Sequence, residues 1–425
     1  MSEKKNIATR DGFGHEIVAL GKENPDLLVV DIDIGKSCKT GDFRKELPGQ
    51  YINVGIAEQN GAGLAAGLAT CGKVPFVVTY AVFGSLRMCE MIRQEVCYPN
   101  LNVKFACSHG GVTPANDGAS HQSIEDMGVL RTIPNMTVIM PADYNSARKL
   151  VRQAAEVYGP VYLRFTRDAI PQIYDEDVEF TIGKAHTIQD GKDVAIIANG
   201  DTVRLAIEAA RELAGKGISA RVLDMHTIKP LDVEAVPAAV NDIGKIITVE
   251  DHNILNGLGS AVCEVAAEMG KGIVKRVGIQ DQFGQSAPYE RLLAINGVTV
   301  EHIVELAQEL DLPVAAMLDT KGPEVRLRTF QNGPVHLKTG QSFTLTTDDV
   351  PGDETRCSIT YADLPQDVKP GNTILLDDGL VRLTVLETTA REIRCRVEND
   401  GVMKDKKGVN VPGVSLSMPY MSQRD

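Results

Sequence analysis

The feature that most constrains the fold is an alternation of short apolar runs with stretches of helical period. It extends through the first two-thirds of the chain. The apolar runs include "DLLVVDID" (26–33), "VPFVVTY" (74–80), "NVKFACS" (102–108), "MTVIMPA" (136–142) and "VYLRFT" (161–166). Between them lie stretches such as "GAGLAAGLAT" and "NSARKLVRQAAEV", which have helical period. This alternation predicts doubly wound, mainly parallel α/β sheets, in which ligands collect at the carboxyl ends of the strands.

The character of the sequence changes twice further along the chain. A polar stretch, "DAIPQIYDEDVEFTIGKA" (168–185), is typical of a linker, and a second α/β unit follows it up to the helical segment "VEHIVELAQEL" (300–310). From about residue 314, period-two alternation with Asp-Gly turns predicts antiparallel hairpins in a small β-barrel or sandwich. We therefore expect three domains, at residues 1–180, 188–310 and 311–425.

Composition limits the partners and the compartment. The net charge of −13 argues against nucleic acid or an anionic membrane as a partner. The N-terminus, "MSEKKNIATRDG", lacks the apolar stretch of a signal peptide, and no uninterrupted apolar run is long enough to span a membrane. The eight cysteines show neither a CxxC pair nor zinc-type spacing, which is typical of reduced thiols. We expect a cytoplasmic protein.

One carboxylate stands out because of its neighbours. Glu58 lies in "NVGIAEQN" (53–60), directly after Gly55, Ile56 and Ala57. A charged side chain among small and apolar residues is either unfavourable or used for chemistry. The alternative is a glutamate at the start of a helix, where the helix dipole favours negative charge. The neighbouring motifs favour the chemical interpretation.

Four stretches, taken together, carry a family resemblance: "DIDIGKS" (31–37), "NVGIAEQ" (53–59), "VTYAVF" (78–83) and "SHGGVTPANDGASHQ" (108–122). Residues 5–310 resemble the C-terminal half of transketolase, and more closely the separate C-terminal subunit of split transketolases. The motifs keep their order and spacing. The resemblance implies a pyrimidine-binding domain for thiamine diphosphate, followed by the family's C-terminal domain.

The resemblance assigns cofactor contacts to four residues. Glu58 matches the glutamate beside N1′ of the aminopyrimidine, where a shared proton favours the imino tautomer that deprotonates C2 of the thiazolium. Tyr80 and Phe83 match the aromatic residues that bracket the pyrimidine, with tyrosine in place of the usual phenylalanine. Asp33 matches a residue close to the thiazolium. The third aromatic residue of some members has no clear counterpart among residues 85–87.

The resemblance assigns sugar contacts to five residues. Asp117 and His121 in "NDGASHQ" match a pair that hydrogen-bonds sugar hydroxyls and moves protons, which makes His121 a catalytic candidate. His109 matches a further histidine of the sugar channel, and such a histidine titrates near neutral pH and donates from both nitrogens once charged. Ser37 and Arg167 match the serine and arginine that hold the sugar phosphate.

Some of these assignments leave alternatives open. Ser37 could instead cap a helix, and Arg167 could be an ordinary surface arginine. Asn116 and Ala119 depart from the family's usual "EDGPTHQ", which leaves the sugar contacts open. A further family signature, "VEDHNILNGLGSAV" (249–262), is assigned to structure and interface rather than to catalysis.

The sequence lacks the motif that would hold the cofactor's diphosphate and its Mg²⁺. That site needs a GDG motif and a downstream asparagine pair, whereas the Gly-Asp pairs here continue as "GDFRKE", "GDTVRL" and "GDETRC". The family's diphosphate domain is absent, and in the family the cofactor lies between the two domain types across a subunit interface. We therefore expect half an active site, inactive until an N-terminal, diphosphate-binding subunit completes it in a homodimer or heterotetramer.

Residues 312–425 resemble pyruvate kinase in "LPVAAMLDTKGPEVRL", "SITYADLPQDVKPGNTILLDDG" and "KKGVNVPGVSLSMP". The stretch covers one barrel strand and the small β lid domain. The resemblance implies potassium ligands at Asp319 and Thr320. It also implies a pair between Arg326 and Asp378 in the closed lid, and a nucleotide contact for Lys407.

Most of the pyruvate kinase (β/α)₈ barrel is absent, including the catalytic lysine, so pyruvate kinase activity is not expected. The strand "VAAMLDT" lacks its barrel neighbours and should be poorly ordered or expose an apolar edge. The lid itself has enough alternating strands to fold alone. The seam at about 309–312 fits a natural fusion, an artificial chimera or a gene joined in error.

The favoured interpretation is the C-terminal subunit of a thiamine-diphosphate-dependent transketolase, which transfers a two-carbon ketol unit between sugar phosphates. A deoxyxylulose-phosphate synthase is the enzymatic alternative, because it shares the glutamate and the "DG..HQ" motif. A non-catalytic fusion, in which either half only docks, is the alternative from another class. Pyruvate kinase function through the lid would require a complementing barrel.

Overall fold

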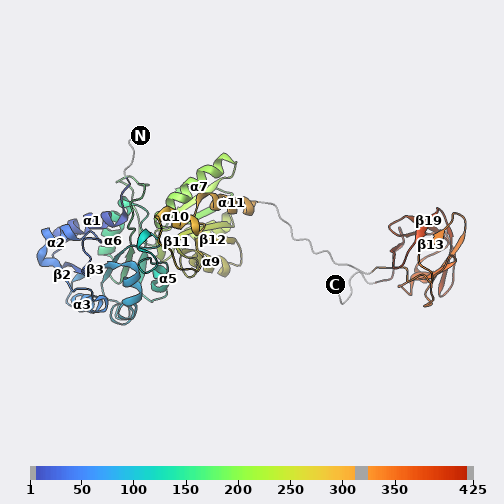
Figure 1. Ribbon diagram of the computed structural model, residues 1–425, viewed down its shortest axis with the longest axis horizontal. Coiled ribbons are helices and arrows are strands. Elements are labelled where there is room, and N and C mark those ends of the chain that lie inside the picture. Colours follow the sequence, from blue (N-terminus) through green and yellow to red (C-terminus); the bar gives the residue numbers. More distant parts are fainter. Residues whose placement is uncertain (1–5, 312–323, 419–425) are drawn as a thin grey trace. The chain divides into compact units, whose positions relative to one another are not determined.

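The structure is a computed structural model that describes residues 6–311 and 324–418 (Figure 1). The chain divides into two compact units, Met1–Pro313 and Val314–Asp425. The first unit contains two open α/β sheets, and the second is built mainly of β-strands. Both fold classes are those that the apolar patterns predict. Within the described residues, no helix has the length and apolar character needed to cross a membrane.

The first sheet has seven strands in the order β10-β5-β6-β4-β3-β1-β2. Neighbouring strands are parallel except for β10, which is antiparallel to β5. Every residue of β1, β4 and β6 is buried, as expected for strands covered on both faces. The strands are β1 (Leu27–Asp31), β2 (Tyr51–Asn53), β3 (Val74–Tyr80), β4 (Lys104–Ser108), β5 (Thr137–Ile139), β6 (Val161–Arg164) and β10 (Thr227–Lys229).

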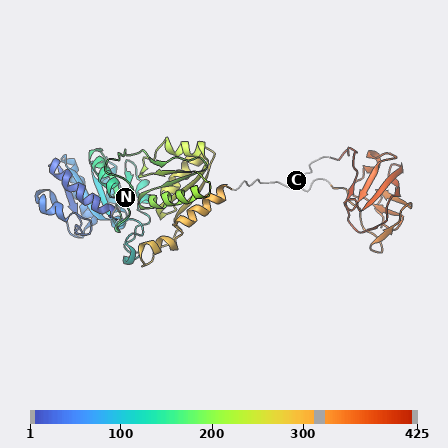
Figure 2. The same ribbon diagram turned by 90° about the horizontal axis from the view of Figure 1, so that it is seen from above.

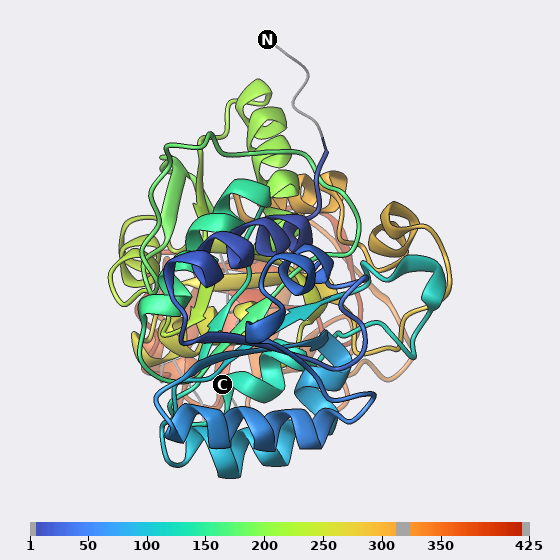
Figure 3. The ribbon, with the colours of Figure 1, turned by 90° about the vertical axis from the view of Figure 1, so that its left-hand side faces the viewer.

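Helices cover both faces of this sheet (Figure 3). Because successive strand residues point to opposite faces, Phe76 and Val78 of β3 join one core cluster and Val77 joins the other. The first cluster also contains residues of α1 and α6, and the second contains residues of α3 and α5. The helices are α1 (Thr9–Glu23), α2 (Gly41–Glu46), α3 (Glu58–Thr70), α4 (Cys89–Met91), α5 (Asp126–Arg131) and α6 (Tyr144–Glu156), with π-helical turns at Phe83–Arg87 and Ile92–Cys97.

The second sheet has five strands in the order β12-β11-β8-β9-β7, parallel except for the edge strand β7. Its strands are β7 (His186–Gln189), β8 (Val194–Ala198), β9 (Ala220–Asp224), β11 (Lys245–Asn253) and β12 (Ile273–Ile279). The helix α11 packs against α7 beside this sheet (Figure 2). The helices are α7 (Val203–Gly215), α8 (Ala235–Asp242), α9 (Leu258–Glu268), α10 (Tyr289–Ile295) and α11 (Val300–Asp311).

The two α/β domains are joined by more than the connecting chain. Strand β10 follows β9 in sequence but pairs with β5 of the first sheet, with Thr227 opposite Ile139. The polar stretch 168–185 is irregular, as a linker should be, yet Tyr174 and Phe180 within it are buried. The first unit is therefore one continuous body with two sheets.

The second unit has a six-stranded sheet in the order β15-β14-β18-β17-β16-β20 and a separate antiparallel pair, β13-β19. Exposed and buried residues alternate along β18, which confirms the period-two pattern, and the unit has its own apolar core. The expectations for "VAAMLDT", Asp319 and Thr320 lie outside the described residues. The strands are β13 (Val335–Leu337), β14 (Ser342–Thr346), β15 (Arg356–Ser358), β16 (Thr373–Leu376), β17 (Val381–Thr388), β18 (Glu392–Val397), β19 (Gly401–Met403) and β20 (Val409–Asn410), and a short helix, α12, spans Leu364–Asp367.

Candidate active site

The candidate site lies where β3 and β4 end, at the carboxyl edge of the first sheet. Tyr80 is the last residue of β3 and pairs in register with Ser108, the last residue of β4. His109 follows directly, so the centroids of the Tyr80 and His109 rings lie 3.9 Å apart. Parallel strands place their ends at one edge of the sheet, which explains why two motifs 28 residues apart come together.

Glu58 is the first residue of α3, and its side chain is only 9% exposed. The turn before it contains Gly55 at φ +74°, a conformation that glycine adopts without strain. Arg87 Nη1 donates to Glu58 Oε1 over 2.8 Å. The carboxylate therefore lies at the start of a helix, which is the alternative that the sequence left open for Glu58. It also pairs with the guanidinium of Arg87.

The aromatic cluster, formed by Tyr80, Phe83, His109 and His121, brings together residues from two separate motifs. The centroid of Phe83 lies 6.1 Å from that of Tyr80 and 5.7 Å from that of His121. The guanidinium carbon of Arg87 lies 4.4 Å from the centroid of Phe83. Arg87 ends the π-helical turn that begins at Phe83, and this turn directs its side chain back over the ring towards Glu58. Carboxylate, flat cation and aromatic ring thus form one continuous arrangement.

The protonation state of His109 is not the one that the sequence predicted. Its side chain is buried and its backbone adopts φ +66°, and Nδ1 shares a hydrogen bond of 2.8 Å with Ser108 Oγ. Burial, followed by the nearby charges of Arg10 and Arg167, lowers the pKa of His109 to about 3. The expectation that His109 titrates near neutral pH was therefore wrong. The imidazole is neutral at pH 7 and donates from one nitrogen only.

The loop after β4 carries the other predicted sugar contacts. Asp117 is exposed at its tip, and Arg167 Nη1 lies 3.7 Å from Asp117 Oδ2. The same Nη1 donates to the carbonyl oxygen of Pro114 over 2.6 Å. His121 is half-buried, and its Nδ1 shares a hydrogen bond of 2.9 Å with Ser120 Oγ. Arg167 is thus held against this loop and is not an isolated surface arginine.

Arg10 is a residue of this region that the sequence analysis missed. Its Nη1 donates to the carbonyl oxygen of Ser37 over 2.9 Å, and its Nε is buried without a hydrogen-bond partner within the described part of the chain. Its charge also acts on Arg167, and burial lowers its pKa. Arg10 brings a positive charge to the backbone of Ser37, and Arg167 is close enough to act on that charge. No spacing in "ATRDGFG" distinguishes Arg10, because its role depends on the packing of α1 against the loop after β1.

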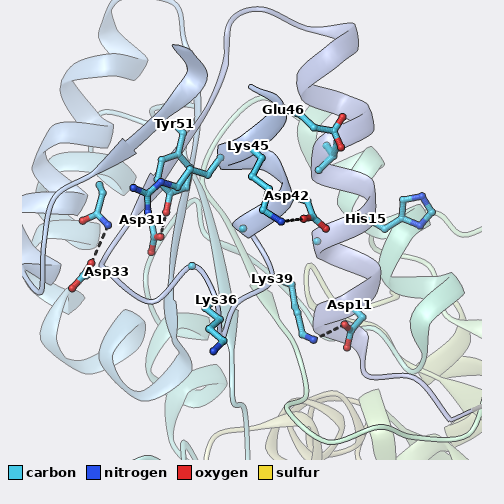
Figure 4. Close-up of a pocket in the computed structure, with 16 residues that line it drawn as sticks. Asp11, His15, Asp31, Asp33, Lys36, Lys39, Asp42, Lys45, Glu46 and Tyr51 are labelled. Atoms are coloured by element: carbon cyan, nitrogen blue, oxygen red, sulfur yellow. Dashed lines mark hydrogen bonds and ion pairs between the residues drawn. The ribbon is translucent and has the colours of Figure 1, made fainter. Parts of the chain in front are cut away.

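Asp33 lines a cavity that contains none of the aromatic residues Tyr80, Phe83, His109 and His121. Its backbone has φ +62°, and its carboxylate accepts a hydrogen bond of 3.0 Å from Asn53 Nδ2. It lines a cavity of about 1050 Å³ bordered by α1, α2 and the loop after β1 (Figure 4). Lys36 and Lys39 also line it, and Lys39 pairs with Asp11 over 2.8 Å. Asp33 is the predicted cofactor contact that this cavity contains.

The structure also brings together three residues predicted by the pyruvate kinase resemblance. Arg326, Asp378 and Lys407 line one cavity of about 320 Å³ in the second unit. Arg326 Nε donates to Glu324 over 2.7 Å, and Lys407 Nζ lies 3.0 Å from Asp377 Oδ1. Within residues 6–311 and 324–418, no group of three or more His, Cys, Asp or Glu residues is arranged to hold a metal ion.

Comparisons with known families agree with the two α/β domains. Residues 5–172 match the transketolase pyrimidine-binding domain, and residues 183–303 match the transketolase C-terminal domain. Residues 294–425 match the pyruvate kinase barrel domain. A transketolase C-terminal section from Methanocaldococcus jannaschii is 44% identical over 71% of this chain and 95% of its own length. The chain belongs to the transketolase family.

Its relatives include subunits of divided enzymes. One of them, a subunit of the apulose-4-phosphate transketolase of Phocaeicola vulgatus, is 41% identical over 71% of this chain and 97% of its own length. A solved structure described as a split gene transketolase, an inactive beta4 tetramer, is 45% identical. It superposes with a TM-score of 0.68 over 72% of this chain and 98% of that chain. The fold is shared by a transketolase of Campylobacter jejuni at 23% identity and a TM-score of 0.62, over 72% of this chain and 47% of that chain.

Proposed function

We propose that the first unit is the C-terminal subunit of a thiamine-diphosphate-dependent transketolase, which transfers a two-carbon ketol group between sugar phosphates. The observation that carries this proposal is the Arg87 guanidinium, which lies over the Phe83 ring and donates to the Glu58 carboxylate. A guanidinium is planar and bears N–H groups. Arg87 thus lies where a flat ring with N–H groups could stack on Phe83 and hydrogen-bond Glu58. An aminopyrimidine has these properties, so Phe83 and Glu58 fit the pyrimidine of thiamine diphosphate.

The roles of the cofactor residues follow from their positions. Thiamine diphosphate, when bound, supplies a carbanion at C2 that can accept and release the ketol group. Glu58 would hold a proton against the pyrimidine nitrogen that faces it, and its burial keeps competing water away. Phe83 and Tyr80 would hold the flat ring by stacking. Asp33, in the loop after β1, is the proposed neighbour of the thiazolium.

The roles of the substrate residues follow from the charges around them. Ser37 and Arg167 would bind the sugar phosphate, and the charge that Arg10 adds beside Ser37 would favour an anion there. His109, neutral at pH 7, would donate one hydrogen bond to a sugar oxygen. Asp117 and His121 would bind hydroxyl groups, with His121 as the residue that moves a proton.

The first unit would complete its active site with a partner. We propose that an N-terminal, diphosphate-binding subunit supplies the Mg²⁺ ligands and the diphosphate contacts. The assembly would be a homodimer or a heterotetramer. Two relatives support this arrangement, one named as a transketolase subunit and the other as a split gene transketolase. We also place the protein in the cytoplasm, because its eight cysteines are all free thiols.

The second unit is proposed to be a detached pyruvate kinase lid. Its proposed limits are residues 311–425, after a pyrimidine-binding domain at 1–180 and a C-terminal domain at 188–310. Arg326, Asp378 and Lys407 are the proposed lid and nucleotide contacts, which is supported by the one cavity that all three line, and Asp319 and Thr320 are the proposed K⁺ ligands. A phosphoryl-transfer reaction would also require residues of a pyruvate kinase barrel, so residues 311–425 are proposed to be inactive by themselves.

A deoxyxylulose-phosphate synthase is the second candidate. The synthase of Geobacter sulfurreducens is 39% identical over 67% of this chain, although the match spans only 45% of that enzyme's length. Such an enzyme condenses pyruvate with glyceraldehyde phosphate. Ser37 and His109 favour the transketolase reaction, since both belong to the proposed sugar-phosphate channel.

The deciding experiment measures ketol transfer from xylulose 5-phosphate to ribose 5-phosphate. The purified chain would be assayed alone and with an N-terminal transketolase subunit, thiamine diphosphate and Mg²⁺. Activity that requires the partner and is lost in Glu58→Gln is expected, while Glu90→Gln on α4 serves as the matched control. Pyruvate condensation is assayed in parallel. Transfer by the chain alone would contradict the half-site proposal, and condensation without ketol transfer would favour the synthase.

A further inference from the structure

The loop that carries the proposed sugar contacts is held by the C-terminal domain. This loop, residues 109–122, follows β4 and contains His109, Asp117 and His121. Its two ends are tied to each other by reciprocal backbone hydrogen bonds between Gly111 and Ser123 of 2.8 and 2.9 Å. Two further attachments come from the C-terminal domain of the same unit, one at the start of the loop and one that reaches its middle and its end.

The first attachment is Asp251 of β11. Both of its carboxylate oxygens accept from the backbone nitrogen of Val112, over 3.1 and 3.0 Å. Gly111 lies against the same carboxylate, where a Cβ would come within 1.9 Å of Asp251 Oδ2, and its φ of +60° favours glycine. The buried Arg164 donates to the carbonyl oxygens of both Asp251 and Ser123, so it holds strand β11 and the end of the loop together.

The second attachment is the segment Gly284–Ser286, which lies between β12 and α10. Ser286 Oγ donates to the carbonyl oxygen of Asn116 over 2.6 Å, directly before Asp117. Gln122, directly after His121, is buried and donates through Nε2 to the carbonyl oxygen of Gln285 over 2.9 Å. A Cβ on Gly284 would lie 1.6 Å from Gln122 Oε1, so the two segments pack together without room for a side chain at residue 284.

We propose that Gly284, Ser286 and Asp251 are positioning residues that set the sugar-contacting loop of the transketolase site. This rests on the proposed function, since it assigns the loop its ligand, a phosphorylated sugar. The loop is held at the residue before Asp117, at the residue after His121 and at the turn after His109. The backbone between these points therefore has little conformational freedom. The C-terminal domain thereby acts on substrate binding without contacting the substrate. Glu58 lies on α3, outside this loop, and its hydrogen bond to Arg87 should not depend on these attachments.

Two variants test the proposal in the complex with an N-terminal subunit. Ser286→Ala removes one hydrogen bond, and Gly284→Ala displaces the Gln122 carboxamide. Each is expected to raise KM for xylulose 5-phosphate roughly two- to ten-fold, the range for one lost hydrogen bond. The Kd of thiamine diphosphate, measured by calorimetry, should stay within about two-fold. Ser286→Thr, which keeps the hydroxyl, should restore KM. Gly215→Ala, in the open end of α7, is the matched control.

A second measurement uses the chain alone and needs no activity. Hydrogen exchange followed by mass spectrometry should show faster exchange in residues 109–122 in both variants, with α3 unchanged. If exchange in 109–122 equals wild type in both, the proposal fails, whether or not the complex is active. An unchanged KM, or equal losses in KM, kcat, cofactor affinity and thermal stability, would also overturn it. A wild-type complex that neither binds cofactor nor transfers ketol groups would instead refute the proposed function.

Discussion

Arg87 pairs with Glu58 across 2.8 Å, so an arginine whose side chain is 56% exposed holds a carboxylate whose own side chain is nearly buried. The same guanidinium lies over Phe83. If the pyrimidine of the cofactor binds where we propose, it must displace Arg87 from both partners. In that case, Arg87 of the free subunit competes with the pyrimidine for Glu58 and Phe83.

Replacing Arg87 should strengthen cofactor binding. A partly exposed ion pair contributes little, about 0.2–1 kcal/mol, so its removal should lower the Kd of thiamine diphosphate by a factor of about 1.4 to 5. The measurement is calorimetric titration of the Arg87→Ala complex, with Arg93→Ala, an exposed arginine of the neighbouring π-helical turn, as control. Weaker binding in Arg87→Ala alone would mean that the guanidinium supports the cofactor and does not compete with it.

Arg167 should matter for phosphorylated sugars only. A hydrogen bond to a charged group contributes about 1.5–3 kcal/mol, so Arg167→Ala should raise KM for a phosphorylated donor by roughly ten- to a hundred-fold. KM for an unphosphorylated ketose should change little. Arg211→Ala, on the exposed face of α7, is the control. An equal effect on both donors would show that Arg167 acts by holding Pro114 in place.

Asp224 should make the first unit less stable as the pH rises. It is fully buried and accepts from Tyr174 Oη over 2.7 Å, and burial raises its pKa to about 8. Between about pH 4 and 8 the folded state keeps a proton that the unfolded chain releases, so the free energy of unfolding falls as pH increases. For one proton the slope approaches about 1.4 kcal/mol per pH unit.

The Asp224→Asn variant tests this directly, because the amide can still accept from Tyr174 but does not ionise. Denaturant unfolding at pH 6.5, 7.25 and 8 should show a smaller loss of stability in the variant than in wild type. His226 has its pKa lowered to about 4 and contributes the opposite slope, but only below its unfolded value near 6.5, outside this range. Parallel pH profiles for the two proteins would assign the dependence to another group.

The two compact units should unfold independently. Each has its own apolar core, with the Phe343 and Leu383 cluster confined to the second. A protein that ends at residue 311 should keep the melting temperature of the first unit within about 2 °C and bind the partner subunit as the full chain does. Calorimetry of the full chain should show two transitions, of which the truncated protein retains one. A single, lower transition after truncation would mean that the units stabilise each other.

Much of the fold could be predicted because its strands are buried on both faces. The runs at 26–33, 74–80 and 102–108 became β1, β3 and β4, since an apolar run of that length has few other stable solutions. Strand β2 was missed because its three residues are half-exposed and carry no apolar pattern. Strand β10 was missed because its pairing with β5 is tertiary, and no local pattern encodes it.

The candidate site was predictable where it depended on residue order and not where it depended on packing. The contact between Tyr80 and His109 follows from two strand ends in register. The neutral state of His109 does not, because it results from burial and from Arg10, which reaches the site from α1. The role of Asp251 was likewise hidden, since "VEDHN" reads as a strand and its partner amide lies 139 residues earlier.

Strand β10 has a consequence for how such chains can be divided and recombined. A cut within residues 168–185 would appear natural from sequence, because the stretch is polar and irregular. It would nevertheless remove the strand that covers β5 and leave that edge of the first sheet unpaired, open to association with other chains. Among the sheets of residues 6–311 and 324–418, none has strands on both sides of a junction placed after α11. Exchange of modules between genes can therefore add or remove a tail such as the β-rich unit, whereas the two α/β domains must be inherited together.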